Sequence, residues 1–192
     1  NTGYNPFTRE GKKTAAYEIC EQLDWVAPDV VFVPVGDGNI LSGLWKGFRD
    51  LHAIGLIDHL PKLVAVQAEG AASICRAFDA DGTLRPASGQ TIADSIAVRA
   101  PKDGEAALAA LRQSIGDAII VSDQEILEAM GLLAREEGGE RGAGDGAGLD
   151  GDRHGAAGGG HRGNHYVDLI QSQEAGGQSG VGCEILRTVG QG

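Results

Sequence analysis

Residues 30–43 read VVFVPVGDGNILSG, and this stretch indicates the fold class. The run from Val30 to Val35 is apolar, rich in β-branched residues and bounded by glycine, as is typical of a strand buried in a parallel sheet. After the glycines, apolar residues recur at helical spacing, at Leu41, Leu44, Trp45 and Phe48. We therefore expect a buried strand, a glycine-rich turn and an amphipathic helix, with Asn39 as the N-cap of that helix.

The turn between this strand and helix has the properties of an anion-binding site. A helix N-terminus presents unpaired backbone N–H groups and about half a positive charge, so it can hold a phosphate without a side-chain cation. The turn matches neither common nucleotide-binding pattern, because it lacks the lysine and hydroxyl residue of the P-loop and the G-x-G-x-x-G spacing. Glycines also end strands for steric reasons, so this stretch alone supports a phosphate site and a plain connection equally.

Strand and helix patterns alternate along the chain as far as residue 137. Further short apolar strands are expected at 63–68 and 118–121. Helix starts are expected at Thr14, Glu69, Asp103 and the capping box formed by Ser122 and Glu125. This alternation predicts an α/β fold with a mostly parallel sheet and helices on both faces. In such sheets ligands bind beyond the carboxyl ends of the strands, where the turn at 36–39 lies.

Composition excludes several classes of partner. The chain has 16 basic and 27 acidic residues, a formal charge of −11, which argues against a nucleic-acid partner. It has no apolar run near the roughly 20 residues needed to cross a bilayer, so we expect no membrane association. The cysteines, Cys20, Cys75 and Cys183, form no C-x-x-C pair, so neither a disulfide framework nor a zinc site is indicated. A reducing cytoplasm fits this pattern.

The last third of the chain has a different composition. Residues 138–192 hold 18 of the 31 glycines, and a strand period is faint there, at 166–170 and 183–186. Such a segment buries too little apolar surface to offset its ordering entropy. We therefore predict a partial enzyme domain at 1–137 and an irregular glycine-rich tail at 138–192, either a linker or the product of a misread frame. The first residue is not methionine, and we interpret the chain as a fragment.

Six blocks of sequence resemble the carboxyl-terminal half of the threonine synthase family, which are fold-type-II enzymes dependent on pyridoxal 5′-phosphate. The blocks are NPF and EGKKT within 5–14, VPVGDGNI at 33–40, WKGF at 45–48, VQAEGA at 66–71, TIADSI at 91–96 and VSDQEIL at 121–127. Serine and threonine dehydratases share several of them, whereas NPF and EGKKT favour the synthase.

The resemblance implies that the glycine-rich loop cradles the cofactor phosphate. The loop residues carried over by position are Gly36, Asp37, Gly38, Asn39 and Ile40. A carboxylate beside a phosphate is unfavourable, so Asp37 is expected to contribute only its backbone N–H. The implied reaction converts O-phospho-L-homoserine and water to L-threonine and phosphate, so the partner is a small phosphorylated amino acid. The oligomeric state is left open, a homodimer of the full-length enzyme included.

The departures from the family concern catalysis. The family's Schiff-base lysine lies in a Ser-x-Lys-Asp-type motif, and no lysine of this chain has that context; the lysines are Lys12, Lys13, Lys46, Lys62 and Lys102. No catalytic residue is therefore assigned, and the isolated chain is expected to be inactive. The alternatives are a serine or threonine dehydratase-type lyase and a non-catalytic fragment that binds phosphate.

Four further features have two interpretations each. The Lys12–Lys13 pair is typical of a solvated corner, although a contact with a substrate phosphate is open. Glu69 suits the dipole of a helix first turn, or it faces the cofactor pocket. His52 and His59 favour a surface position over a ligand role. The three histidines of the tail either form a metal-binding cluster or occur there by chance; they are His154, His161 and His165.

Overall fold

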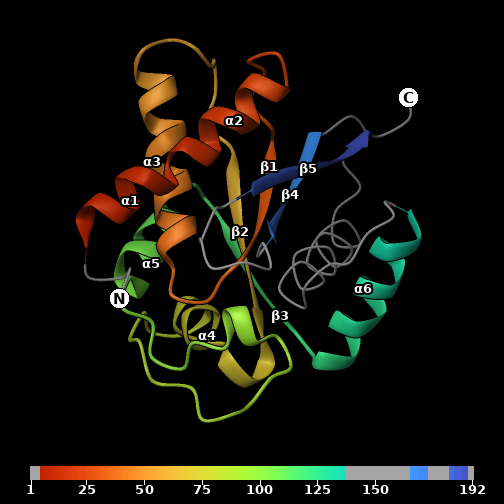
Figure 1. Cartoon of the computed structure of the whole chain (residues 1–192). Coiled ribbons are helices and arrows are strands. Elements are labelled where there is room, and N and C mark those ends of the chain that lie inside the picture. Colours follow the sequence, from red (N-terminus) through yellow and green to blue (C-terminus); the bar gives the residue numbers. More distant parts are fainter. Residues whose placement is uncertain (1–4, 137–164, 173–181, 190–192) are drawn as a thin grey trace.

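The computed structural model describes residues 5–136, 165–172 and 182–189, which form one five-stranded sheet flanked by helices (Figure 1). The strands are β1 Val30–Pro34, β2 Lys62–Ala68, β3 Asp117–Val121, β4 His165–Ser172 and β5 Gly182–Val189, in the spatial order β3-β2-β1-β4-β5. The pairs β3–β2, β2–β1 and β1–β4 are parallel, and only β4–β5 is antiparallel among these strands. The predicted mostly parallel sheet is confirmed.

Alternate residues of the strands serve two separate cores, because successive side chains point to opposite faces. The helices are α1 Pro6–Lys12, α2 Thr14–Gln22, α3 Asn39–Ala53, α4 Ser73–Asp79, α5 Gly104–Gln113 and α6 Asp123–Glu136, with short 3-10 turns at Glu69–Ala71 and Asp94–Ile96. Val31 and Val33 face the larger core, which α2, α3, α4 and α5 share. Phe32 faces the smaller core, together with Ile96 and with Ile126 of α6. Helices therefore cover both faces, as predicted.

Two glycines on α3 allow the junction between α1 and α2 to pack at backbone distance. A Cβ added to Gly43 would lie 2.6 Å from Cβ of Lys12, and one added to Gly47 would lie 2.5 Å from the Lys13 carbonyl oxygen. Residues four apart share one face of a helix, so these glycines form a single stripe. The position of Lys12 is therefore fixed against α3.

The first helix has no counterpart among the elements expected from the sequence. α1 begins at Pro6, and the side chain of its N-cap Asn5 accepts a hydrogen bond from the Phe7 N–H. It has no buried residue, which is why no apolar period marks it. The prediction of Thr14 as a cap is wrong, because Thr14 is the first residue of α2 and its hydroxyl donates to the Gly11 carbonyl.

The starts of the other helices agree in part with expectation. At α3 the N-cap is Gly38, with φ 91°, and Asn39 is already helical, so Asn39 is not the cap. Asp103 is the N-cap of α5 but makes no side-chain capping bond. The capping box at α6 is confirmed: Glu125 accepts from the Ser122 N–H at 2.7 Å, and Ser122 Oγ accepts from the Glu125 N–H at 3.3 Å.

Part of the tail forms regular structure, contrary to expectation. β4 pairs with β1, with Val30 opposite Tyr166, and β5 pairs along the whole of β4. The prediction of little regular structure after residue 138 is therefore wrong for 165–172 and 182–189, the two places where a faint strand period is present; β1 supplies hydrogen-bond partners to β4, and β4 supplies them to β5. The other tail residues lie outside the described part of the chain, so the boundary at 137/138 stays a prediction.

Two smaller expectations can be compared with the described residues. None of the described helices combines the length and the apolar character needed to cross a bilayer. Cys20 and Cys75 are free thiols with no exposed surface, as their places in apolar helix patterns predicted.

Candidate functional site

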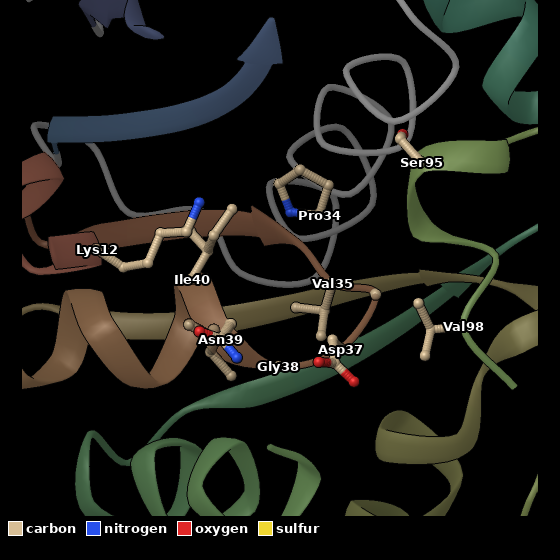
Figure 2. A pocket seen from close by; sticks show the side chains of 11 residues that line it. Lys12, Pro34, Val35, Asp37, Gly38, Asn39, Ile40, Ser95 and Val98 are labelled. Atoms are coloured by element: carbon tan, nitrogen blue, oxygen red, sulfur yellow. The ribbon is translucent and has the colours of Figure 1, made fainter. Parts of the chain in front are cut away.

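A cavity of about 320 Å³ opens where β1 ends and α3 begins. Figure 2 shows it between the glycine-rich loop and the segment that carries Ser95 and Val98. All five loop residues predicted from the sequence line it, and the full lining is Lys12, Pro34, Val35, Gly36, Asp37, Gly38, Asn39, Ile40, Leu41, Ser95 and Val98. The structure thus brings the predicted residues to the carboxyl end of the sheet.

Six consecutive backbone N–H groups of this loop, from Gly36 to Leu41, have no hydrogen-bond partner among the described residues. The preceding N–H, of Val35, donates to the Val66 carbonyl at 2.8 Å, and the following one, of Ser42, donates to the Gly38 carbonyl at 3.0 Å. The first turn of a helix always leaves such donors unpaired. Here the loop adds further unpaired donors before the helix begins, and all six residues line the cavity, as in an anion-binding site.

Glycine is required at residue 38, and a side chain at Gly36 would make tight contacts. Gly38 has φ 91°, and a Cβ there would lie 2.9 Å from Cβ of Ala107 and 3.0 Å from the Asp103 carbonyl oxygen. A Cβ on Gly36 would lie 3.1 Å from Cα of Ile96. A side chain at Gly38 would therefore be strained and would collide with α5 and its N-cap, whereas one at Gly36 would require a small shift of the segment around Ile96.

Asn39 contributes an unpaired polar atom to the site. The residue is 7% exposed, and its Oδ1 is buried with no hydrogen-bond partner among the described residues. A buried acceptor without a partner costs about 1–3 kcal/mol, so such an atom suggests that a donor outside the chain occupies the site. Asn39 therefore presents a free acceptor that a water molecule or a ligand donor can satisfy.

The carboxylate of Asp37 is held by the backbone behind the loop. Its Oδ1 accepts from the Lys102 N–H at 2.6 Å, and its carbonyl oxygen accepts from the Asp103 N–H at 3.2 Å. The Asp103 carboxylate in turn accepts hydrogen bonds from Ser42 of α3 and Arg9 of α1. Since the Asp37 carboxylate is already hydrogen-bonded, its negative charge is partly compensated beside the cavity.

A buried glutamine fixes the strand end beneath the loop. Gln67 is fully buried, and its Nε2 donates to the Val35 carbonyl at 3.0 Å. Its Oε1 accepts from the N–H groups of Ile74 and Cys75, both at 2.9 Å. One side chain therefore ties the end of β1 to the start of α4.

Of the other lining residues, the sequence singles out only Lys12, for which it favours a solvated corner and leaves a contact with a substrate phosphate open. Lys12 is half-buried at the end of α1, and burial lowers the pKa of its ammonium group. Ser95 and Val98 come from a segment that no sequence pattern places near residue 36. The sequence around Ser95 and Val98 does not indicate that they lie near residue 36, because this contact depends on how the sheet and its loops pack in the folded chain.

The other sequence candidates lie outside this cavity. Glu69 is exposed in a 3-10 turn and does not line it. His52 and His59 are on the surface, as favoured from the sequence. Among the residues that the structure describes, no group of three metal-ligating side chains is found, and the side chains of the tail histidines are outside that part.

The site is suited to the phosphate of a small organic molecule. It combines dense N–H donors, glycines that permit close backbone approach and a partly buried lysine. The cavity is larger than a phosphate needs, and its walls at Pro34, Val35 and Ile40 are apolar. The rest of a phosphorylated ligand can therefore lie against these walls.

Comparison with known proteins gives one family match. Residues 1–154 match the sequence profile of the family described as "Pyridoxal-phosphate dependent enzyme". The chain is 46% identical over 136 residues to the threonine synthase of Methanocaldococcus jannaschii, a match that covers 70% of this chain and 34% of the relative. It is 42% identical over 134 residues to the threonine synthase of Mycobacterium tuberculosis, with 70% and 35% covered. The chain thus spans about a third of the length of these relatives.

Solved structures with similar folds include two kinds of enzyme. A threonine deaminase from T.th. has a TM-score of 0.65 and 25% identity, with 79% of this chain and 54% of that chain covered. The threonine synthase from Brucella melitensis, solved with pyridoxal phosphate bound, has a TM-score of 0.60 and 13% identity, with 78% and 38% covered. At 13% identity the second likeness shows the fold alone.

Proposed function

The chain belongs to the pyridoxal-phosphate-dependent enzyme family, and from this membership we propose that Gly36, Asp37, Gly38, Asn39 and Ile40 hold the phosphate of the cofactor. The observation that supports this best is the run of six unpaired N–H groups from Gly36 to Leu41 among the described residues. A phosphate dianion at such a helix N-terminus is stabilised by the hydrogen bonds and by the helix dipole.

The residues of the site fit this group. Gly36 and Gly38 let the backbone approach a phosphate, and the Asp37 carboxylate is occupied by the Lys102 N–H. Pyridoxal phosphate, when bound, supplies an electron sink for negative charge on substrate carbon atoms. The role of this chain is to bind and orient the phosphate end, while the apolar walls at Pro34, Val35 and Ile40 contact the rest of the ligand.

For the whole protein we propose the conversion of O-phospho-L-homoserine and water to L-threonine and phosphate. Identity above 40% with two threonine synthases supports this over the dehydratase alternative, which is represented by a threonine deaminase at 25% identity. Both reactions need the same cofactor, so the phosphate cradle does not distinguish between them.

The cradle is tested with a ligand that cannot bond covalently to lysine. Pyridoxine 5′-phosphate carries the phosphate of the cofactor but no aldehyde, and pyridoxine lacks the phosphate as well. We expect the phosphorylated ligand to shift the amide resonances of 36–41 in a saturable titration and pyridoxine to leave them unchanged. Saturable shifts centred on another part of the chain would contradict the assignment.

The reaction is tested in the whole enzyme with two substrates. We expect equal amounts of L-threonine and phosphate from O-phospho-L-homoserine. Formation of ammonia and 2-oxobutanoate from L-threonine, without turnover of the phosphorylated substrate, would instead establish the dehydratase. Phosphate binding with neither turnover would establish a non-catalytic binding protein.

A further inference from the structure

Lys12 differs from the other cations near the cavity because it has no carboxylate partner among the described residues. By contrast, Arg9 pairs with Asp103, Lys13 with Asp50 at 2.9 Å, and Lys46 with Glu10 at 3.1 Å. Lys12 is nevertheless half-buried, and burial lowers the pKa of its ammonium group. Partial burial of an unpaired ammonium is unfavourable unless an anion joins it.

The neighbours of Lys12 hold it beside the cradle. Its backbone packs against Gly43 of α3, where a Cβ would lie 2.6 Å from the Lys12 Cβ. The adjacent Lys13 is tied to α3 through Asp50, and Glu10 is tied to α3 through Lys46. Figure 2 shows the Lys12 side chain extending beside Ile40, the residue in the first turn of α3. Its position therefore follows from packing and from ion pairs on both sides.

The charges lining the cavity favour an anion. Lys12 and the six free N–H groups supply positive charge, and the first turn of α3 has no acidic residue. The only carboxylate among the described lining residues is that of Asp37, which accepts the Lys102 N–H. In a chain with a net charge of −11, this local excess of positive charge is suited to a doubly charged ligand.

We propose that the Lys12 ammonium binds the phosphate monoester in this cavity directly, as the side-chain counter-charge to the backbone cradle. This inference rests on the proposed function, since it concerns the same site. A hydrogen bond between two charged groups is about twice as strong as a neutral one, so Lys12 adds affinity that the N–H groups alone do not supply. The phosphate belongs to the cofactor or to a phosphorylated amino-acid substrate, and the experiment distinguishes the two.

The test compares phosphorylated ligands with their unphosphorylated counterparts by calorimetric titration. One pair is pyridoxine 5′-phosphate and pyridoxine, and the other is O-phospho-L-homoserine and L-homoserine. Lys12→Gln removes the charge, and Lys12→Arg keeps it. The matched control is Lys62→Gln, because Lys62 is the first residue of β2, at the opposite end of the sheet, and pairs with Asp117 at 3.6 Å.

We expect Lys12→Gln to weaken binding of at least one phosphorylated ligand by about tenfold to a hundredfold, the range for one hydrogen bond to a charged group. Lys12→Arg should restore most of this affinity, and Lys62→Gln should bind as the wild type does. A loss with pyridoxine 5′-phosphate assigns Lys12 to the cofactor phosphate, and a loss with O-phospho-L-homoserine alone assigns it to the substrate phosphate.

Two results would overturn the inference. One is wild-type affinity of Lys12→Gln for both phosphorylated ligands, and the other is an equal loss for a ligand and its unphosphorylated counterpart. In either case, wild-type binding of pyridoxine 5′-phosphate at 36–41 would leave the proposed cradle intact. Failure of the wild type to bind any phosphorylated ligand would instead remove the proposed function, and this inference with it.

Discussion

The two ends of the sheet make tight turns in different ways. At the carboxyl end of β1 the positive φ falls on Gly38, and the loop leaves its N–H groups free among the described residues. At the amino end, positive φ values fall on Gly55, with 74°, and also on residues with side chains: 55° at Asp24, 61° at Trp25 and 52° at Ile115. Ile115 is 85% exposed, so its strained turn has room for a side chain. Glycine is therefore needed where a backbone must be approached closely, and not wherever a turn is tight.

The largest expected effect comes from adding the same side chain to a glycine at each end. Gly38→Val should weaken binding of pyridoxine 5′-phosphate by about a hundredfold or more, because its Cβ would collide with Ala107 and Asp103 and the displaced loop would lose at least two hydrogen bonds to a charged group. The strain should also lower the free energy of unfolding by about 1–3 kcal/mol. Dissociation constants and thermal melts of the ligand-free proteins measure both effects.

Gly55→Val is the control for this comparison. Gly55 has φ 74° at the amino end, but nothing lies within 4 Å of an added Cβ. We expect a similar strain cost and unchanged affinity for the ligand. If both variants kept wild-type affinity, the carboxyl end would have no special role in binding.

The second effect is on stability and concerns buried hydrogen bonds. Gln67→Leu should lower the free energy of unfolding by about 3 kcal/mol or more, since Val35, Ile74 and Cys75 would each lose a buried partner at about 1–3 kcal/mol. The matched variant is Gln113→Leu at the last residue of α5, whose Oε1 accepts from Trp45 Nε1 at 2.8 Å and from the exposed Arg49 at 3.4 Å. A cost of about 1 kcal/mol is expected there. Equal urea midpoints for the two variants would contradict this difference.

The third effect is an increase in stability, and it concerns the turn at Ile115, at the amino end of the sheet. Ile115→Gly should raise the free energy of unfolding by about 1 kcal/mol, because relief of the positive φ outweighs the added chain entropy. Ile54→Gly is the control, since Ile54 is also exposed but has φ −93° and should be destabilised by glycine. Urea denaturation measures both, and a destabilised Ile115→Gly would show that the turn is not strained.

The smallest effect concerns the ion pairs that hold the α1–α2 junction beside the cavity. The hydrogen bond from Lys13 lowers the pKa of Asp50 below its ordinary value of 3.8. The folded state therefore binds this proton less readily than the unfolded state, so the stabilisation is present above pH 3.8 and is lost as the pH falls through the lower folded value. Asp50→Asn should cost no more than about 1 kcal/mol at pH 7, because the pair is partly exposed.

Urea midpoints at pH 7 and at pH 2 measure this dependence. We expect the difference between wild type and Asp50→Asn to shrink at the lower pH. Asp117→Asn, at the amino end, removes the longer contact to Lys62, 3.6 Å, and should have the smaller effect at pH 7. If the stability difference between wild type and Asp50→Asn grew on acidification, folding would raise the pKa of Asp50 and not lower it, which would contradict this prediction.

The central strand, loop and helix could be predicted from sequence because their signals are local. The apolar run forms β1, the glycines end it, and helical spacing marks α3. The error at Asn39 has a physical cause: the left-handed turn at Gly38 starts the helix one residue earlier than a side-chain cap would. α1 escapes prediction for the converse reason, since it has a cap at Asn5 but no buried face.

The site could be predicted only as far as it is continuous in the chain. The five loop residues are recognisable because one segment carries them, but Lys12 and Ser95 reach the cavity through packing between distant segments. For β4 the sequence carries only a faint strand period at 166–170, and its partner could not be predicted because pairing depends on the free edge of β1. Assignment of the phosphate itself rests on the proposed function and stays a prediction.

The glycine stripe of α3 has a consequence for the spacing of charge in the site. α3 begins at Asn39 with the N–H donors, and Gly43 seats Lys12 one turn further along the same helix. The separation between the Lys12 backbone and the N–H donors in the first turn of α3 is therefore set by the pitch of the helix, about 5.4 Å per turn. We therefore expect a tilt of α3 to move the Lys12 backbone and these donors together.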